Sequence, residues 1–395
     1  MLAYVRKKQY LYSLNERLYI MSKNVDRLSK ALPGYTDEQA EEVWKCYRWK
    51  DGKPVCPFCH SQDRQYACKS GKYSGKYKCA HCNRRYSSFS GTVFQYTKLS
   101  FAQIMRGLIF LLQQKAESAI KLANIMGVNY DTAYFFIKRL QMATHQDIKL
   151  SGIVAMDEVY LGGRWKNKHL LERLKIVHDN DIIPKDQTWF TQSEAAQGMS
   201  VSRRPVFGIN DGKHIWLQQL PSHFDSDDLK EIFERTCTDV TLCVSDDSPL
   251  YNGWKVPLEI NCHSKKQYRT PNGHSSNAIE GVFAHLRRRI EAVHIHCAEK
   301  YLQLYLNWFS FTWNYRKQSL LERLAALMRY ISSRICPFRN VLAYDALAKY
   351  RERERLREES DRQYAKKLLQ QAGPLVRGVE VSGKTYTWEM VNSIN

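Results

Sequence analysis

The chain has 395 residues, of which 60 are Lys or Arg and 40 are Asp or Glu, so its formal charge is +20 at neutral pH. This excess favours a polyanionic partner, with nucleic acid the first candidate and an acidic membrane surface the second. No apolar run reaches the roughly 18 residues of a membrane span, and charges interrupt residues 1–21, so neither a spanning helix nor a signal peptide is expected.

The first predicted segment, residues 1–52, is an N-terminal helical region. Residues 1–31 are helix-prone and mixed in charge, and they suggest no chemistry. A turn at Pro33-Gly34 precedes a predicted helix from Tyr35 to Trp49, for which Thr36 is the expected N-cap.

Residues 53–98 contain two closely spaced pairs of cysteines. Cys56 and Cys59 form one C-x₂-C pair, Cys79 and Cys82 form the other, and nineteen residues separate them. This spacing predicts a zinc ribbon in which four thiolates bind one structural Zn²⁺. Four unrelated free cysteines are the alternative.

The same segment is strongly basic and rich in aromatic residues. Between residues 53 and 98 there are nine Lys or Arg and one acid, Asp63. Basic and aromatic side chains together suit contact with a nucleic-acid backbone and its bases. A solvated basic face around a small domain is the alternative.

Residues 99–148 are predicted to form a helix-turn-helix. A helix is expected from Leu99 to Gln114, followed by two apolar-periodic segments that Gly127 separates, with Asn129 as N-cap of the second. The predicted DNA contacts on this second helix are Tyr130, Tyr134, Lys138 and Arg139. A plain helical hairpin is the alternative.

From residue 149 to 320 the pattern alternates between strands and helices, which predicts an α/β domain with a mixed sheet and flanking helices. The predicted strands are Val154–Leu161, Pro205–Asn210, His214–Leu220, Val240–Ser245 and Leu258–His263, with a helix over Asp225–Thr236. Residues 164–204 do not fit this order and are interpreted as an insertion in the first hairpin.

Acidic residues follow two of these apolar strands. Asp157 and Glu158 follow the run Ile153–Met156, and Asp246 and Asp247 end a second run about ninety residues later. Carboxylates from separate strands are suitable ligands for a pair of Mg²⁺ ions in phosphoryl transfer. Ordinary strand ends followed by turns are the alternative.

A third motif follows in a segment of helical period, which places Asn277, Glu280 and Arg287 near one face. A helix laid over the sheet could supply the last ligand. His263, at the end of the last predicted strand, and His274, just before this motif, are interpreted as ordinary polar residues.

Together these motifs resemble a known enzyme family. They are Asp157-Glu158-x-Tyr160-x-Gly162-Gly163, Ser245-Asp246-x₄-Tyr251-Asn252-Gly253, and Asn277-x-Ile279-Glu280-Gly281-x-Phe283 with Arg287-Arg288. They are similar to the catalytic motifs of insertion-sequence DDE transposases with an N-terminal zinc ribbon, which are ISXO-like and related to the Merlin elements. The resemblance spans about Leu32 to Arg316 and implies a ribonuclease-H-like core.

The resemblance also implies roles for single residues. Asp157 is the first catalytic carboxylate and Asp246 the second, while Glu158 and Asp247 are neighbours. Glu280 is favoured as the third ligand, because Arg287 resembles a helix residue of the wider class that contacts the DNA backbone. Asn277 is the alternative third ligand, since this position is asparagine in some members. Arg287 and Arg288 are the expected DNA contacts.

The expected function is that of a DNA transposase, which binds the ends of its mobile element and target DNA and uses Mg²⁺ or Mn²⁺ to cut and join strands. A homo-oligomer is expected, because two ends must be held together. A transposase-derived DNA-binding regulator and a metal-dependent nuclease without transfer activity are the alternatives.

The remaining features concern the tail and the compartment. Residues 321–395 are predicted to be a helical tail, with a charge-dense helix from Tyr344 to Gln371. The chain has 11 cysteines, an odd number, and several of them stand singly in apolar contexts, which predicts free thiols and a reducing cytoplasm. For a protein expected to act on DNA, this means association with the nucleoid. A nuclear location is expected if the host is eukaryotic.

Overall fold

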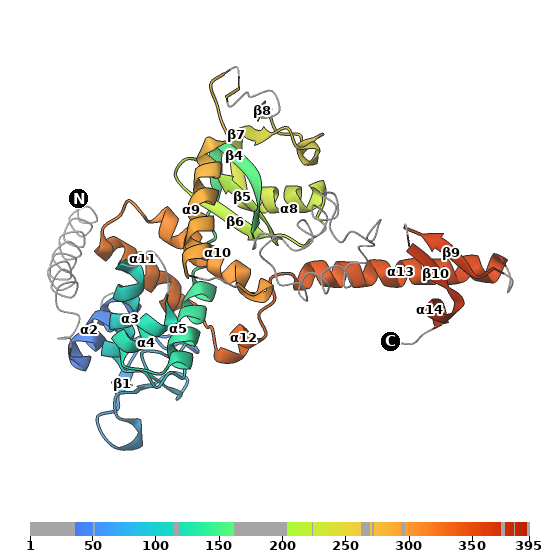
Figure 1. The fold of residues 1–395 in the computed structure, drawn as a ribbon. Helices are drawn as coiled ribbons and strands as arrows, with labels where there is room; N and C mark the ends of the chain where they lie inside the picture. Colours follow the sequence, from blue (N-terminus) through green and yellow to red (C-terminus); the bar gives the residue numbers. More distant parts are fainter. Residues whose placement is uncertain are drawn as a thin grey trace. The chain divides into compact units, whose positions relative to one another are not determined.

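The computed structural model describes residues 36–49, 52–113, 118–161, 204–222, 224–261, 269–270, 272–293, 297–372, 376–382 and 384–392. The chain divides into two compact units, residues 1–344 and 345–395, coloured along the sequence in Figure 1. Gly162, Gly163, nearly all of the predicted insertion, and His263 lie outside the described residues, as does the predicted helix-prone start of the chain.

The first unit contains a helical layer built around one large core. Its helices are α2 (Asp37–Arg48), α3 (Phe101–Gln113), α4 (Ala119–Met126), α5 (Tyr130–Ala143) and α11 (Leu320–Ser333). α2 begins as predicted, because Thr36 and Gln39 form a reciprocal capping box. α11 follows the predicted catalytic motifs in the sequence, yet Leu324, Leu327 and Ile331 are fully buried in this core.

The turn between α4 and α5 forms as the sequence predicts. Gly127 ends α4 with φ 66°, a left-handed conformation that glycine adopts without steric cost. The side chain of Asn129 then accepts a hydrogen bond from the N–H of Thr132 at 2.9 Å and so caps α5. The two helices pack on each other, and their role in DNA binding stays a prediction.

A small antiparallel sheet carries the predicted zinc ribbon. Its strands are β1 (Gln65–Ala67), β2 (Tyr77–Cys79) and β3 (Arg85–Tyr86), with β2 in the middle. Around it, Trp49, Tyr77 and Tyr86 pack ring against ring beside the cysteines. This core holds few side chains, so a bound metal would contribute much of its stability.

The central sheet has five strands in the order β6-β5-β4-β7-β8. Their bounds are β4 Leu150–Leu161, β5 Arg204–Asn210, β6 Ile215–Gln219, β7 Cys237–Asp246 and β8 Leu258–Asn261. The first three pair antiparallel as a meander, while β7 and β8 run parallel to β4. This order and these directions are those of a ribonuclease-H-like core.

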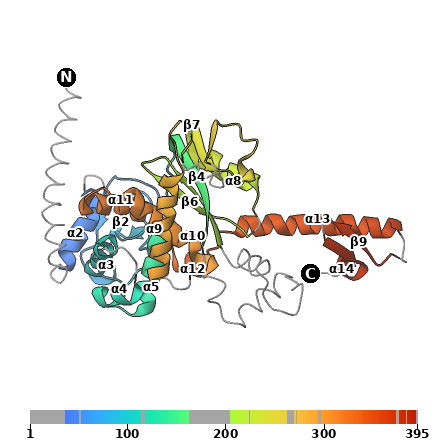
Figure 2. The same cartoon turned by 45° about the horizontal axis from the view of Figure 1, so that its top comes forward.

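Helices cover both faces of this sheet (Figures 1 and 2). On one face, α9 (Asn277–Val293) and α10 (Glu299–Asn314) pack on Ala155 and Val159. On the other, α8 (Ser226–Thr236) packs on Val154 and Met156. Successive residues of β4 therefore alternate between an α9 face and an α8 face.

Gly208 of β5 allows α9 to approach the sheet closely. A Cβ atom at this position would lie 2.6 Å from the Phe283 ring and 2.9 Å from Ile279. Gly208 is also the residue of β5 that pairs with Asp157 of β4. α9 thus packs tightly on the sheet at the level of the first predicted catalytic carboxylate.

We expect Gly208→Ala to destabilise the protein by about 1–3 kcal/mol, because the added methyl group overpacks the contact with Phe283. Thermal unfolding of the full chain measures this effect, and Phe283→Leu in the same chain should restore part of the loss. Gly281→Ala is the matched control, because a Cβ atom there meets nothing within 4 Å. Equal melting temperatures for the two alanine variants would contradict the prediction.

The second unit is a long helix with a hairpin at its end. It comprises α13 (Ala348–Ala372), β9 (Gly378–Val381), β10 (Lys384–Thr387) and α14 (Trp388–Asn392). Ala365 and Leu369 of α13 are buried where they pack against the hairpin. The long helix was predicted, but the hairpin and α14 were not. The short helix α12 (Phe338–Leu342), within the predicted tail, and α11, which begins one residue before that tail, belong to the first unit.

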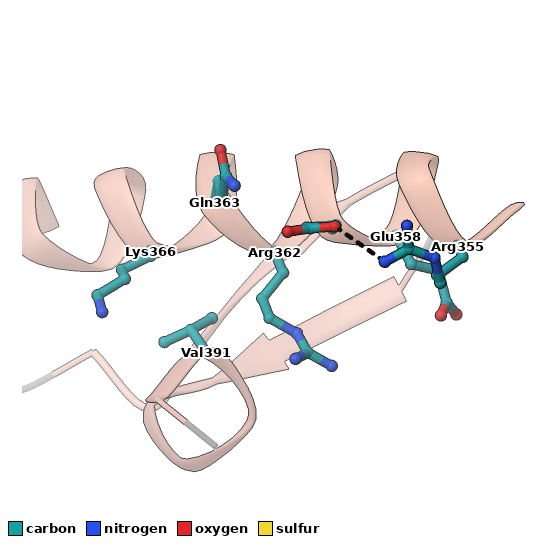
Figure 3. Close-up of a pocket in the computed structure, with 7 residues that line it drawn as sticks. Arg355, Glu358, Arg362, Gln363, Lys366 and Val391 are labelled. Carbon is teal, nitrogen blue, oxygen red and sulfur yellow. Dashed lines mark hydrogen bonds and ion pairs between the residues drawn. The ribbon is translucent and has the colours of Figure 1, made fainter. Parts of the chain in front are cut away.

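A hollow of about 470 Å³ lies between α13 and α14 (Figure 3). Its lining residues are Arg355, Glu358, Glu359, Arg362, Gln363, Lys366 and Val391. Both signs of charge occur there, and Arg355 pairs with Glu359 at 3.4 Å along the helix. This is the composition of a solvated helix face.

Among the described residues, no helix is both long and apolar enough to cross a membrane.

Candidate functional site

The four predicted zinc ligands meet in one cluster. The Sγ atoms of Cys56, Cys59, Cys79 and Cys82 all lie within 4.8 Å of one another. The Cys56–Cys82 and Cys59–Cys79 sulfur pairs are each 3.6 Å apart. A tetrahedron with Zn–S bonds of about 2.3 Å has edges of roughly 3.8 Å, so the donor set and its spacing fit a structural Zn²⁺.

The two halves of this cluster have the same local structure. The N–H of His60 donates to the carbonyl of Cys56, and the N–H of Asn83 donates to that of Cys79, each at 3.0 Å. His60 and Asn83, which follow the second cysteine of their pairs, both have φ 58°. Two turns of one kind therefore present the sulfurs toward a common centre.

Basic and aromatic side chains lie together on the surface of the ribbon. The Arg84 guanidinium lies 5.0 Å from the Phe58 ring, and that of Arg85 lies 4.3 Å from the Tyr73 ring. Phe58 is 46% exposed, so the ring and its cation face solvent together. Such pairs suit contact with phosphates and bases.

The structure brings Asp157 and Asp246 to the same level of adjacent strands. Ala155 of β4 pairs with Val244 of β7 in parallel, and each aspartate lies two residues further along its strand. Both aspartates therefore belong to the α9 face of the sheet. Asp157 Oδ1 accepts from the N–H of Glu158 at 2.7 Å, and Asp246 Oδ1 accepts from that of Ser248 at 3.2 Å.

Glu158 belongs to the opposite face, where Tyr251 donates a hydrogen bond to its Oε1. Burial is the main reason why the pKa of Glu158 rises to about 7, and the charges of Asp157 and Asp246 raise it further. Burial, followed by the charge and hydrogen bond of Glu158 and the charges of Asp157 and Asp246, raises the pKa of Tyr251. The charges of Asp157 and Asp246 thus act on both groups, although Glu158 belongs to the opposite face of the sheet.

A pH-dependent stability follows from Glu158. Because the folded chain holds this proton more tightly than the unfolded chain, stability should fall as pH rises from about 4.5 to about 7. The full loss is about 3 kcal/mol. Glu158→Gln still accepts the hydrogen bond from Tyr251 and should remove this loss, so its melting temperature should exceed that of the parent at pH 8 but not at pH 4. If the difference in melting temperature between Glu158→Gln and the parent were the same at pH 4 and pH 8, the prediction would be contradicted.

The start of α9 is fixed by polar contacts. Ser276, which is 1% exposed, donates to Glu280 Oε1 at 2.7 Å. Hydrogen bonds to Glu259 join the segment before α9 to β8: His274 Nδ1 lies 2.9 Å from Glu259 Oε2, and Asn272 Nδ2 donates to Glu259 Oε1. Hydrogen bonds from Thr270 and its neighbours lower the pKa of Glu259 to about 2. His274 is thus a structural anchor of the third motif, which agrees with its interpretation as an ordinary polar residue.

The candidate third ligands and the two predicted DNA contacts of α9 are all exposed. They are Asn277, Glu280, Arg287 and Arg288. Within the described chain, the cysteine cluster is the one group of three or more His, Cys, Asp or Glu side chains whose ligand atoms lie within 4.8 Å of one another. Bringing a carboxylate of α9 to Asp157 and Asp246 therefore requires side-chain or helix movement.

Comparison with known families agrees with this arrangement. The family of ISXO2-like transposase domains matches residues 149–314, and the family of transposase zinc-ribbon domains matches residues 35–85. The chain belongs to this family of DDE transposases with an N-terminal zinc ribbon. A search of curated proteins gave no match.

The predicted DNA contacts of this transposase on α5 have different surroundings. Tyr130 is 52% exposed, and its ring stacks on that of Tyr134 at 6.0 Å near the start of the helix. Arg139 is half-buried, and burial lowers its pKa. The first turns of α5 are therefore the part of this helix that is accessible to DNA.

Lys138 corrects the sequence prediction. It was expected to reach phosphates, but its side chain is 1% exposed. Its Nζ atom lies 3.6 Å from the ring centre of Tyr305 and 5.0 Å from that of Tyr301, both on α10, and 3.1 Å from Gln141 Oε1. The ammonium group thus joins α5 to α10 through cation–π contacts.

Proposed function

We propose that this transposase cuts and joins DNA strands at a divalent-cation site formed by Asp157, Asp246 and one residue of α9. The observation that carries the proposal is the shared level and shared face of the two aspartates on adjacent strands, with α9 packed on that face. Rigid strands position the ligands, and the helix brings the third one beside them.

The donor set fits Mg²⁺ or Mn²⁺. Both aspartates offer carboxylate oxygens, the ligands that these hard cations prefer. In each, one oxygen accepts a hydrogen bond from the main chain, which fixes the direction of the carboxylate. Bound cations in such sites activate the attacking oxygen and stabilise the leaving one.

The helical position of Glu280 supports it over Asn277 as the third ligand. The side of α9 that packs on the sheet carries Ile279 and Phe283. At about 100° per residue, Glu280 lies roughly 60° from Phe283, whereas Asn277 lies roughly 120° from it on the solvent side. Since Phe283 contacts Gly208, opposite Asp157, Glu280 has the shorter path to the aspartates.

The remaining residues of α9 would orient the DNA. Arg287 and Arg288 are exposed on the same helix and can bind phosphates on either side of the scissile bond. In the first step, water oxygen bonds to phosphorus and the bond to the 3′ oxygen breaks, leaving a 3′ hydroxyl and a 5′ phosphate. In the second step, that 3′ hydroxyl attacks a target phosphodiester and displaces the target's own 3′ oxygen.

The N-terminal elements would bind the ends of the mobile element. The zinc ribbon presents cations stacked on exposed rings, and the start of α5 presents Tyr130 and Tyr134. Phosphate contacts of this kind make affinity fall steeply with salt. Because both ends must be held during transfer, we propose that a homo-oligomer carries out the reaction.

The test is a strand-transfer assay with the full zinc-loaded chain, duplexes that carry candidate terminal repeats, and Mg²⁺ or Mn²⁺. Cut ends that become joined to a target duplex are the expected products. Cutting without joining would indicate a nuclease, and metal-independent binding without cutting would indicate a regulator. Either result would overturn the proposed reaction.

A further inference from the structure

Asn261, the last residue of β8, has an unusual environment. Its side chain is 0% exposed, and neither Oδ1 nor Nδ2 makes a hydrogen bond. Within the part of the chain that the structure describes, it is the one amide side chain with both polar atoms buried and unpaired. Because burial removes the hydrogen bonds that water would supply, such a group calls for a partner.

The position of Asn261 indicates what that partner is. It pairs with Asp246 of β7 in the parallel register of the sheet. Paired residues of neighbouring strands are about 4.8 Å apart and point to the same face. A single row across the α9 face thus contains Gly208, Asp157, Asp246 and Asn261.

Nearby protein groups leave the amide of Asn261 unused. Asp246 Oδ1 accepts from the N–H of Ser248, and Ser245 Oγ donates to the carbonyl of Asp246. Asn210, a second buried asparagine of the same sheet, differs sharply. Its Nδ2 donates to the carbonyl of Ala278 at 3.1 Å, and its Oδ1 accepts from the N–H of Gly212 at 2.7 Å. Asn210 is satisfied by the fold, and Asn261 is not.

We infer that the Asn261 side chain is a further ligand of the divalent-cation site, with Oδ1 directed to the cation beside Asp246. An amide oxygen is a hard donor that Mg²⁺ and Mn²⁺ accept alongside carboxylates. Its Nδ2 group is then a donor to a water or phosphate oxygen of the same site. This inference rests on the proposed function, because it requires the cation at Asp157 and Asp246.

The test measures Mn²⁺ binding to the full zinc-loaded chain by titration calorimetry, without DNA. Asn261→Leu has a similar volume and no polar atoms, and we expect it to weaken Mn²⁺ binding about tenfold. Its melting temperature should not fall, because the substitution removes an unpaired buried amide. Asn261→Asp should bind Mn²⁺ at least as tightly as the parent.

Asn210→Leu is the matched control. It removes an amide whose atoms are both bonded, so its melting temperature should fall while its Mn²⁺ affinity stays unchanged. If Asn261→Leu fails to fold, Asn261→Asp decides, and weaker Mn²⁺ binding than the parent would overturn the inference.

Two negative results are distinguishable. In the first, Asn261→Leu binds Mn²⁺ as tightly as the parent, whereas Asp246→Asn no longer binds it. This result would overturn the role of Asn261 and leave the proposed function intact. Parental affinity in both Asp157→Asn and Asp246→Asn would show instead that the cation site is not at these strands, and the proposed function would fail with the inference.

Discussion

Asp157→Asn and Asp246→Asn should each reduce DNA cleavage by roughly a thousandfold or more while leaving DNA affinity nearly unchanged. Asparagine keeps the shape of the side chain but removes the negative charge that attracts the cation. A loss of about 4 kcal/mol of transition-state stabilisation corresponds to this factor. Both residues belong to the central sheet, whereas the exposed rings proposed to bind DNA belong to the ribbon and the start of α5.

Asp239→Asn is the matched control for this experiment. Asp239 is an exposed aspartate on β7, the strand that carries Asp246, and its φ of 49° is one that asparagine tolerates. Single-turnover cleavage and a binding titration, made on the same preparations, separate chemistry from affinity. Cleavage at the parental rate in either catalytic variant would contradict the assignment, as would equal losses in the control.

The sequence predicts best what depends on neighbouring residues. The capping box at Thr36, the turn at Gly127 and the cap at Asn129 each depend on a few adjacent positions, and the structure contains all three. The cysteine pairs belong to the same class, since each C-x₂-C turn forms locally and only the meeting of the two turns is long-range. The strand order could also be predicted, because the motifs resemble those of a family with a ribonuclease-H-like core.

Contacts between distant segments are what the sequence leaves open. Lys138 looks like a surface cation at helical spacing, but Tyr301 and Tyr305, more than 160 residues away, bury it. Likewise, alternation along β4 separates Asp157 from Glu158, yet it cannot say which of them faces α9. Gly208 and Asn261 carried no signal at all, because their roles arise from the pairing register alone.

α11 shows why the sequence alone does not reveal the domain boundaries. Its sequence follows the predicted catalytic motifs, and nothing in its local pattern links it to the N-terminal helices. In the structure, Val93 donates a main-chain hydrogen bond to Ile331 at 3.0 Å, and Arg48 Nη1 donates to the carbonyl of Ser332 at 2.8 Å. A fragment that ends near residue 150 would expose this core, so DNA binding is best measured on the full chain.

Loss of the zinc ligand in Cys79→Ser should unfold the ribbon and abolish binding to element ends. The ribbon core contains little beside the cysteines, Trp49, Tyr77 and Tyr86, so we expect four thiolates bound to zinc to supply most of its stability. Structural Zn²⁺ in small domains contributes roughly 10 kcal/mol or more to folding. The surrounding helical core is far larger and should remain folded.

Hydrogen exchange of the full chain measures this directly. Amides of β1, β2 and β3 should lose protection in Cys79→Ser, the zinc content should fall from one ion to none, and salt-dependent DNA binding should weaken at least tenfold. Cys68→Ser is the matched control, because Cys68 lies in the same ribbon but outside the four-sulfur cluster. If Cys79→Ser still bound one zinc ion and its β2 amides kept the protection of the parent, the four sulfurs would not share a metal. If the ribbon stayed intact but no longer bound DNA, the effect would lie in DNA recognition and not in folding.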